Sequence, residues 1–363
     1  MKLWNKLLSL TLAAVMALSV AGCGQTAVSS ETVSSEAASS EAAPTAAPTA
    51  SAETAVEGIS FTDQAGRTVT LDAPADTVVS CYYITTYAVI ALGKTDAIVG
   101  LENKADTRAL YSLAAPELPQ LTQVGTLKSL DVEAVASLAP DLVIMPKKLM
   151  DNAQTLEDLG IPVMVVDPET QEGLETMLTL MGQALGAEDR AAQLVSYYHD
   201  QQDRMAQLTE GLDKPSVCVL SNSSYLSVAP AGMYQNDLIE LAGGTNAAAD
   251  IQDDYWAEVS YETLLAMAPD VLVIPSAASY TAQDVLGDAQ LAALPAVQNG
   301  AVYTMPQGLD EWDSPTPSSV LGIQWLTSVL HPDAYSFEEF TADAQNFYQT
   351  FYGFTPDAAL LTK

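Results

Sequence analysis

One block of sequence occurs twice, at residues 130–146 and 259–275, and the two copies align without a gap. Each copy predicts a capped amphipathic helix, a stop at an Ala-Pro-Asp triplet, and a strand that is apolar on both faces. Such a strand is typical of a parallel sheet covered by helices on both sides. The chain is therefore predicted to be α/β, with two similar lobes, and clefts between lobes are common sites for small ligands.

Strands and helices alternate through the rest of the chain, which indicates Rossmann-like lobes with central parallel sheets. A hairpin is predicted over residues 59–71. A long helical stretch, 172–212, is broken once near Gly186, and its second half is predicted to be one rigid helix that bridges the lobes. A helix is also predicted over 282–293. The predicted organisation is an N-terminal lobe at 58–186, a bridging helix at 187–212 and a C-terminal lobe at 213–363.

The N-terminus predicts export and anchoring. Lys2 and Lys6 precede an apolar run that ends in Val20-Ala-Gly-Cys23, so residues 1–22 are predicted to be a signal peptide. Small residues followed directly by Cys resemble the cleavage site of bacterial lipoproteins, with Cys23 as the lipidated residue. The alternative is an ordinary secretory signal with a chance Cys. Residues 23–57 then form a Ser-, Ala-, Thr- and Pro-rich tether that is predicted to be disordered. The expected location is the extracellular face of a cell membrane, contacted through the lipid anchor alone.

Composition excludes several functions. The net charge of −33 argues against a nucleic-acid partner. Two His residues that lie far apart in the sequence do not predict a metal site. The best candidate nucleophile is Cys81, with no His near it in sequence, so no catalysis is predicted. Cys81 and Cys218 fall in different lobes and are expected to be buried thiols rather than a disulfide.

Two repeats and six further segments occur in a characteristic order: 63–71, 78–93 and 124–125 before the first repeat, 242–246 between the repeats, and 294–303 and 321–326 after the second. The chain resembles the class III substrate-binding proteins of ABC importers, those for iron–siderophores, haem and cobalamin. This resemblance implies two lobes bridged by one long helix and a function in delivering a small-molecule metal complex to a permease. No cofactor is expected, although the ligand can itself contain iron or cobalt, and a monomer is expected. The alternative function is a surface sensor or scavenger with the same fold.

The resemblance also implies a docking role for Glu133 and Glu262, which occupy equivalent places in the two repeats. In this family one Glu on each lobe meets arginines of the permease, and charges at the rim of an interface set docking register. The alternative is that each Glu is only an acidic residue in the first turn of a helix.

The cleft is expected at the carboxyl ends of the strands. Trp256 lies six residues before Glu262, where cobalamin-binding relatives have a cleft aromatic. The alternative for each aromatic residue predicted for the cleft is that it packs in the core. The alternative for Lys147 and Lys148 is that they lie in a solvated loop. The absence of Arg after Arg204 argues against a strongly anionic siderophore. The predicted cleft residues are Tyr82, Tyr83, Lys128, Lys147, Lys148, Tyr225, Tyr234, Trp256 and Trp312.

Overall fold

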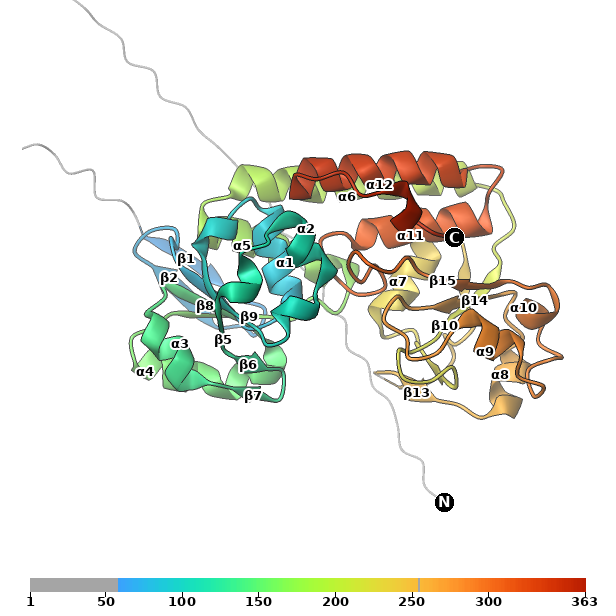
Figure 1. Cartoon of the computed structure of the whole chain (residues 1–363), viewed down its shortest axis with the longest axis horizontal. Coiled ribbons are helices and arrows are strands. Elements are labelled where there is room, and N and C mark those ends of the chain that lie inside the picture. The colour runs from blue at the N-terminus through green and yellow to red at the C-terminus, as the bar shows by residue number, and fades with distance from the viewer. Residues whose placement is uncertain (1–57, 254) are drawn as a thin grey trace, which may run out of the picture. The chain divides into compact units, whose positions relative to one another are not determined.

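The computed structural model describes residues 58–253 and 255–363, which belong to one compact unit, Ala55–Lys363. Within this unit two α/β lobes are joined by α6 (Glu188–Thr209) (Figure 1). The predicted signal peptide, the lipidation site Cys23 and the tether lie outside the described residues.

The N-terminal lobe is built on a five-stranded parallel sheet of order β5-β4-β3-β8-β9. The predicted hairpin over 59–71 is confirmed as the antiparallel pair β1–β2. The strands of this lobe are β1 (Ile59–Thr62), β2 (Thr68–Leu71), β3 (Val78–Ser80), β4 (Ile98–Leu101), β5 (Thr122–Gln123), β6 (Gly125–Thr126), β7 (Ser129–Leu130), β8 (Leu142–Pro146) and β9 (Val163–Val166). Its helices are α1 (Tyr83–Ala91), α2 (Ala109–Ala114), α3 (Val132–Leu138), α4 (Ala153–Asp158) and α5 (Gln171–Leu185).

The C-terminal lobe is built on a four-stranded parallel sheet of order β12-β10-β14-β15. Its strands are β10 (Ser216–Val219), β11 (Ser227–Val228), β12 (Thr245–Asn246), β13 (Ala257–Glu258), β14 (Val271–Ile274) and β15 (Val302–Thr304). Its helices are α7 (Tyr234–Leu241), α8 (Tyr261–Met267), α9 (Ala282–Leu286), α10 (Pro295–Gln298), α11 (Ser319–Leu330) and α12 (Phe337–Tyr352).

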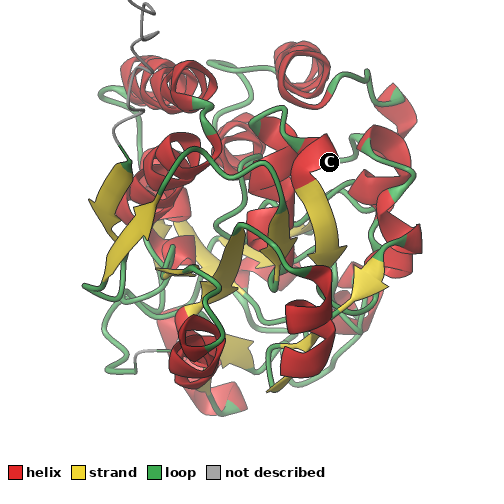
Figure 2. Ribbon diagram, turned by 90° about the vertical axis from the view of Figure 1, so that its left-hand side faces the viewer, coloured by secondary structure: helices red, strands yellow, loops and turns green. Residues whose placement is uncertain are grey.

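Each sheet has a buried hydrophobic cluster on both faces, as the apolar strands predict, and Figure 2 shows helices around the strands. In β8, Leu142 and Ile144 belong to one buried cluster while Val143 and Met145 belong to another. β14 alternates in the same way between two clusters. Since successive side chains of a strand point to opposite faces, this alternation places a hydrophobic core on each side of each sheet.

The two copies of the repeated block fold alike. Asp131 caps α3 and Ser260 caps α8, each accepting a hydrogen bond from the backbone N–H three residues later. Both helices end at an Ala in the left-handed region, Ala139 with φ 45° and Ala268 with φ 48°. A strand follows in each case, so the duplication seen in the sequence is also a duplication in structure.

The connection between the lobes is reinforced by a second helix. α5 ends at Gly186, whose φ of 60° suits glycine, and the 22-residue α6 follows. α12 lies beside α6 along its length (Figure 1), and Arg204 of α6 pairs with Asp343 of α12 at 2.5 Å. α12 also contacts α1 of the N-terminal lobe. Two packed helices therefore span the lobes, which favours a stiff connection.

The predicted helix 282–293 is wrong in length, because α9 ends at Leu286. Gly287 caps the helix, and Asp288 holds the turn that follows. The Asp288 carboxylate accepts hydrogen bonds from the backbone N–H of Gln290 and from the hydroxyls of Tyr225 and Tyr261. A side chain held this way competes with helical backbone bonding and favours a turn.

Candidate ligand-binding cleft

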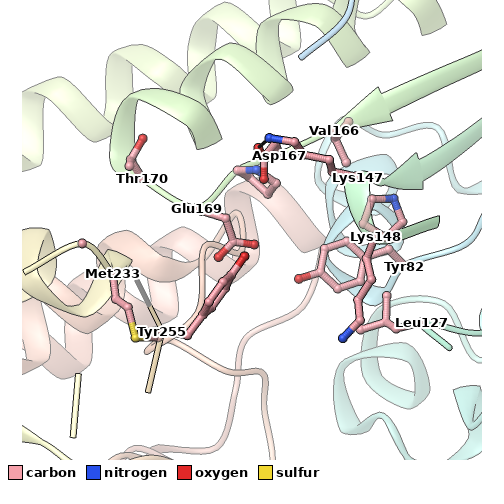
Figure 3. Close-up of a pocket in the computed structure, with 13 residues that line it drawn as sticks. Tyr82, Leu127, Lys147, Lys148, Val166, Asp167, Glu169, Thr170, Met233 and Tyr255 are labelled. Carbon is pink, nitrogen blue, oxygen red and sulfur yellow. Dashed lines mark hydrogen bonds and ion pairs between the residues drawn. The ribbon is translucent and has the colours of Figure 1, made fainter. Parts of the chain in front are cut away.

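A cleft of about 830 Å³ lies between the two lobes (Figure 3). Its N-terminal wall follows the carboxyl ends of β8 and β9, as expected for a parallel sheet. The N-terminal lobe contributes Tyr82, Leu127, Pro146, Lys147, Lys148, Val166, Asp167, Pro168, Glu169 and Thr170, and the C-terminal lobe contributes Gly232, Met233 and Tyr255.

The charges in the cleft are partly paired. Lys147 Nζ lies 2.7 Å from Asp167 Oδ2, and this hydrogen bond raises the pKa of Lys147. Burial, followed by the nearby Asp167 charge, raises the pKa of Glu169. Figure 3 shows the side chains of Glu169 and Tyr255 pointing toward one another, with Tyr82 and Lys148 on the other side of the cleft. The site thus offers two aromatic rings together with groups of both charges.

A smaller recess of about 330 Å³ opens beside the cleft in the N-terminal lobe. Tyr82 and Leu127 line both spaces, so the two are adjacent. The other residues around the recess are Cys81, Tyr83, Glu102, Asn103, Lys104, Arg108, Gly125, Thr126 and Lys128.

Arg108 connects this recess to the C-terminal lobe. Its Nη1 lies 2.6 Å from Glu311 Oε1, and its guanidinium lies 4.0 Å above the centre of the Tyr83 ring. Glu311 also accepts a hydrogen bond of 3.2 Å from the hydroxyl of Tyr87. Among the described residues, this is the only ion pair that joins the N-terminal lobe to the C-terminal lobe.

The inner end of the recess is a buried carboxyl group. Glu102 is 6 % exposed and accepts hydrogen bonds from the hydroxyls of Tyr111 at 2.6 Å and Thr86 at 2.8 Å. Burial raises the pKa of Glu102, although both hydrogen bonds act in the opposite direction. The buried carboxyl group therefore ionises less readily than an exposed one and opposes a neighbouring anion less.

With this geometry established, comparison with known proteins identifies the family: the family model described as periplasmic binding protein matches residues 78–309. The chain belongs to the periplasmic binding protein family. It is 25 % identical over 331 residues to the molybdate-binding protein MolA of Haemophilus influenzae, covering 82 % of this chain and 92 % of that protein. It is 27 % identical to a cobalamin-binding protein of Halobacterium salinarum, covering 66 % of this chain and 64 % of that protein.

A crystal structure of a periplasmic solute-binding protein from Veillonella parvula matches with a TM-score of 0.73 and 25 % identity, covering 84 % of this chain and 97 % of that one. The predicted fold of two α/β lobes is thereby confirmed, as is the resemblance to solute-binding proteins of ABC importers. Proteins of this family act outside the cytoplasm, bind small ligands and pair with permeases.

In this periplasmic binding protein, five of the nine residues predicted for the cleft lie around the two spaces. Tyr82, Lys147 and Lys148 line the cleft, and Tyr83 and Lys128 line the recess. The recess thus brings in a second group of side chains from the loops that follow β3 and β6.

The other four predicted residues line neither space. Tyr234 and Trp312 are 2 % and 1 % exposed and belong to the core, which corrects the prediction for both. Trp312 donates a hydrogen bond of 2.8 Å from Nε1 to the hydroxyl of Tyr348. Tyr225 packs edge-on against Tyr280. Trp256 packs against the larger core cluster and is only partly buried.

Sequence reasoning missed Asp167, Glu169 and Tyr255. The first two directly follow β9, so the rule that placed lysines after β8 also points to them. Tyr255 is 69 % exposed and lines the cleft, whereas the adjacent Trp256 packs against the core. Both residues lie in irregular structure before β13, so the sequence offers no periodicity that shows which one faces the ligand.

Glu133 and Glu262 are both exposed and each is the second residue of its helix. Figure 1 shows α3 and α8 on the same side of the molecule, opposite α6 and α12. Hydrogen bonds from its own backbone N–H and from the Ser260 side chain lower the pKa of Glu262. This carboxylate therefore ionises more readily than an ordinary Glu.

Among residues 58–253 and 255–363 there is no group of three or more His, Cys, Asp and Glu side chains placed to hold a metal ion. Cys81 and Cys218 are buried thiols not joined in a disulfide, and burial raises the pKa of both, that of Cys218 to about 12. None of the helices described is both long and apolar enough to cross a bilayer.

Proposed function

We propose that this protein is an extracytoplasmic, membrane-anchored lipoprotein that captures an iron complex (a siderophore or haem) or a cobalamin-type ligand and delivers it to an ABC importer. The observation that supports this most is the cleft of about 830 Å³, whose walls come from both lobes. Tyr82 and Tyr255 offer aromatic surface suited to a large, partly flat ligand. The protein acts as a monomer without a cofactor of its own, and any iron or cobalt arrives with the ligand.

The ligand class is tested by titrating the purified mature protein with molybdate, ferric citrate, haem and cyanocobalamin in a calorimeter. Molybdate and cobalamin are included because relatives are named for them. We expect at least one metal complex to bind with a Kd of about 1 μM or lower, or about −8 kcal/mol. Tyr82→Ala and Tyr255→Ala should weaken that binding, while Tyr225→Phe, outside the cleft, should not. The proposed ligand class is wrong if neither the iron complexes nor cobalamin bind at that level.

Docking to the permease is assigned to Glu133 and Glu262. Two exposed carboxylates on equivalent helices of two similar lobes suit a partner with matching basic groups. The double variant Glu133→Lys and Glu262→Lys should abolish uptake by cells that carry the importer and leave ligand affinity unchanged. Glu338→Lys is the matched control, because Glu338 is also the second residue of its helix but lies on α12, on the opposite side in Figure 1.

This experiment also separates transport from the alternative function. A surface sensor or scavenger does not need to dock with a permease, so both reversals would leave its activity intact. Normal uptake by cells that carry the double variant would contradict the docking role of Glu133 and Glu262. Reduced uptake by Glu338→Lys as well would point instead to a general loss of helix stability, since each first-turn acid contributes only about 0.3–1 kcal/mol.

The lipid anchor is assigned to Cys23. Cys23→Ser should move the protein from the membrane fraction to the soluble fraction, and mass spectrometry of the wild-type protein should show a diacylated N-terminal Cys. Cys218→Ser is the control, since Cys218 is buried in the C-terminal lobe. An unmodified Cys23 in the membrane fraction would contradict the assignment.

A further inference from the structure

Positive charge is concentrated around the cleft and its recess. The chain has 13 Lys and Arg residues against 46 Asp and Glu. Five of the 13 line these two adjacent spaces: Lys104, Arg108, Lys128, Lys147 and Lys148. Only three acids share the same lining, namely Glu102, Asp167 and Glu169. A chain of net charge −33 therefore presents more cations than acids around these two spaces.

Some of these cations are already neutralised. Lys147 pairs with Asp167, and Arg108 pairs with Glu311. Lys104 and Lys128 form no ion pair among the described residues, and both line the recess. The acid inside the recess, Glu102, already accepts two hydroxyl hydrogen bonds. The recess therefore has two lysines available for an anionic group.

The backbone at Lys104 is in an unfavourable conformation. Its φ of 69° and ψ of 29° place it in the left-handed region, where Gly or Asn is the less costly residue. Its backbone N–H donates to the side-chain oxygen of Gln123 at 2.9 Å, which holds the loop in place. A Lys at a position that favours Gly or Asn is consistent with a functional side chain there.

We propose that the recess binds an oxyanion group of the ligand, held by Lys104 and Lys128, so that the transported solute is anionic. This inference rests on the proposed function and adds the charge of the ligand. The oxyanion can be a carboxylate of a chelate or a small inorganic oxyanion. Since Tyr82 and Leu127 stand at the junction of the two spaces, the remainder of a larger ligand lies in the cleft. Lysine ammonium groups bind such oxygens through charge-assisted hydrogen bonds.

The test compares ferric citrate, haem and molybdate, which are anionic, with cyanocobalamin, which carries no net charge. At least one anionic probe should bind, more weakly as the salt concentration rises. Lys128→Gln should weaken its binding about tenfold, the loss of one charge-assisted contact. Lys214→Gln, an exposed lysine away from both spaces, should leave the affinity unchanged.

Lys104→Gly separates binding from folding. Glycine relieves the left-handed backbone, so the melting temperature should stay the same or rise while affinity for the anionic probe falls about tenfold. Unchanged affinity in both lysine variants for every probe that binds, cyanocobalamin included, would overturn the inference and leave the proposed function standing. Binding of cyanocobalamin alone, weakened in both variants, would support the recess as the site of its phosphodiester and reject the net negative charge of the solute. Binding of molybdate alone, weakened in both lysine variants, would support an oxyanion site in the recess. It would also reject iron complexes and cobalamin as the ligand class. Failure of all four probes would reject both.

Discussion

Removing the Arg108 guanidinium should destabilise the contact between the lobes. The Arg108–Glu311 pair has an N–O distance of 2.6 Å, and its side chains are 22 % and 21 % exposed, between the surface and buried cases. The guanidinium also stacks on Tyr83 at 4.0 Å, a contact worth about 0.5–1 kcal/mol. Arg108→Gln leaves Glu311 with only the Tyr87 hydroxyl as a side-chain partner. We expect the free energy of unfolding to fall by about 2–3 kcal/mol.

Glu311→Gln should cost less, about 1–2 kcal/mol, because Arg108 keeps its stacking on Tyr83. The double variant should then show a coupling energy of about 1–2 kcal/mol. The measurement is urea unfolding of the wild type, both single variants and the double variant at neutral pH and low salt. If the two effects add to within about 0.5 kcal/mol, the pair does not couple the lobes and the reasoning is refuted.

Three further predictions concern stability. Burial, followed by the charge of Glu311, raises the pKa of Asp313 to about 7, so between about pH 4 and pH 7 the native state retains a proton that the unfolded state has lost. The free energy of unfolding should therefore fall as pH rises from about 4 to about 7. Asp313→Asn should remove part of this pH dependence, measured by urea unfolding. Gly322→Ala should lower the free energy of unfolding by about 1–3 kcal/mol, since a Cβ there would lie 2.5 Å from the carbonyl oxygen of Trp312. An unchanged melting temperature in this variant would contradict the close contact. The Asp141 side chain accepts three hydrogen bonds, whereas that of its repeat partner Asp270 accepts one. Asp141→Ala should therefore lower the free energy of unfolding by about 1.5–3 kcal/mol and Asp270→Ala by about 0.5–1.5 kcal/mol. Equal losses would contradict the view that the number of hydrogen bonds sets the difference.

Most of the fold could be predicted because it depends on apolar periodicity. Strands such as β9 (Val163–Val166) are apolar at every position, and this pattern requires helices on both faces of the sheet. Capping residues and glycines then mark helix ends, as at Gly186. The prediction for α9 was too long because it passed over Gly287, the C-cap of the helix. The turn that follows at Asp288 is held by the hydroxyl groups of Tyr225 and Tyr261, which lie elsewhere in the sequence.

The site was less predictable because a position near a strand end does not determine where a side chain points. Lys148 and Trp312 both follow predicted strands, yet one lines the cleft and the other is buried beside Tyr348. Arg108 does not directly follow a strand. The expectation drawn from the absence of Arg concerned only the part of the chain after Arg204. The cations that line the recess, Lys104, Arg108 and Lys128, all precede Arg204 in the chain, so that expectation does not extend to them.

The repeated block is similar in the two lobes, whereas the residues that line the cleft differ between them. Helix, stop and strand are conserved between the copies in structure, and both copies carry an exposed Glu at the same helical position. The resemblance ends directly after the strands: Pro146 is followed by Lys147 and Lys148, whereas Pro275 is followed by Ser276 and Ala277. The duplicated part therefore supplies the scaffold and the matched acidic positions. The loops that differ place the lysines on one wall of the cleft, which favours a ligand bound in one orientation, with its anionic end toward the N-terminal lobe.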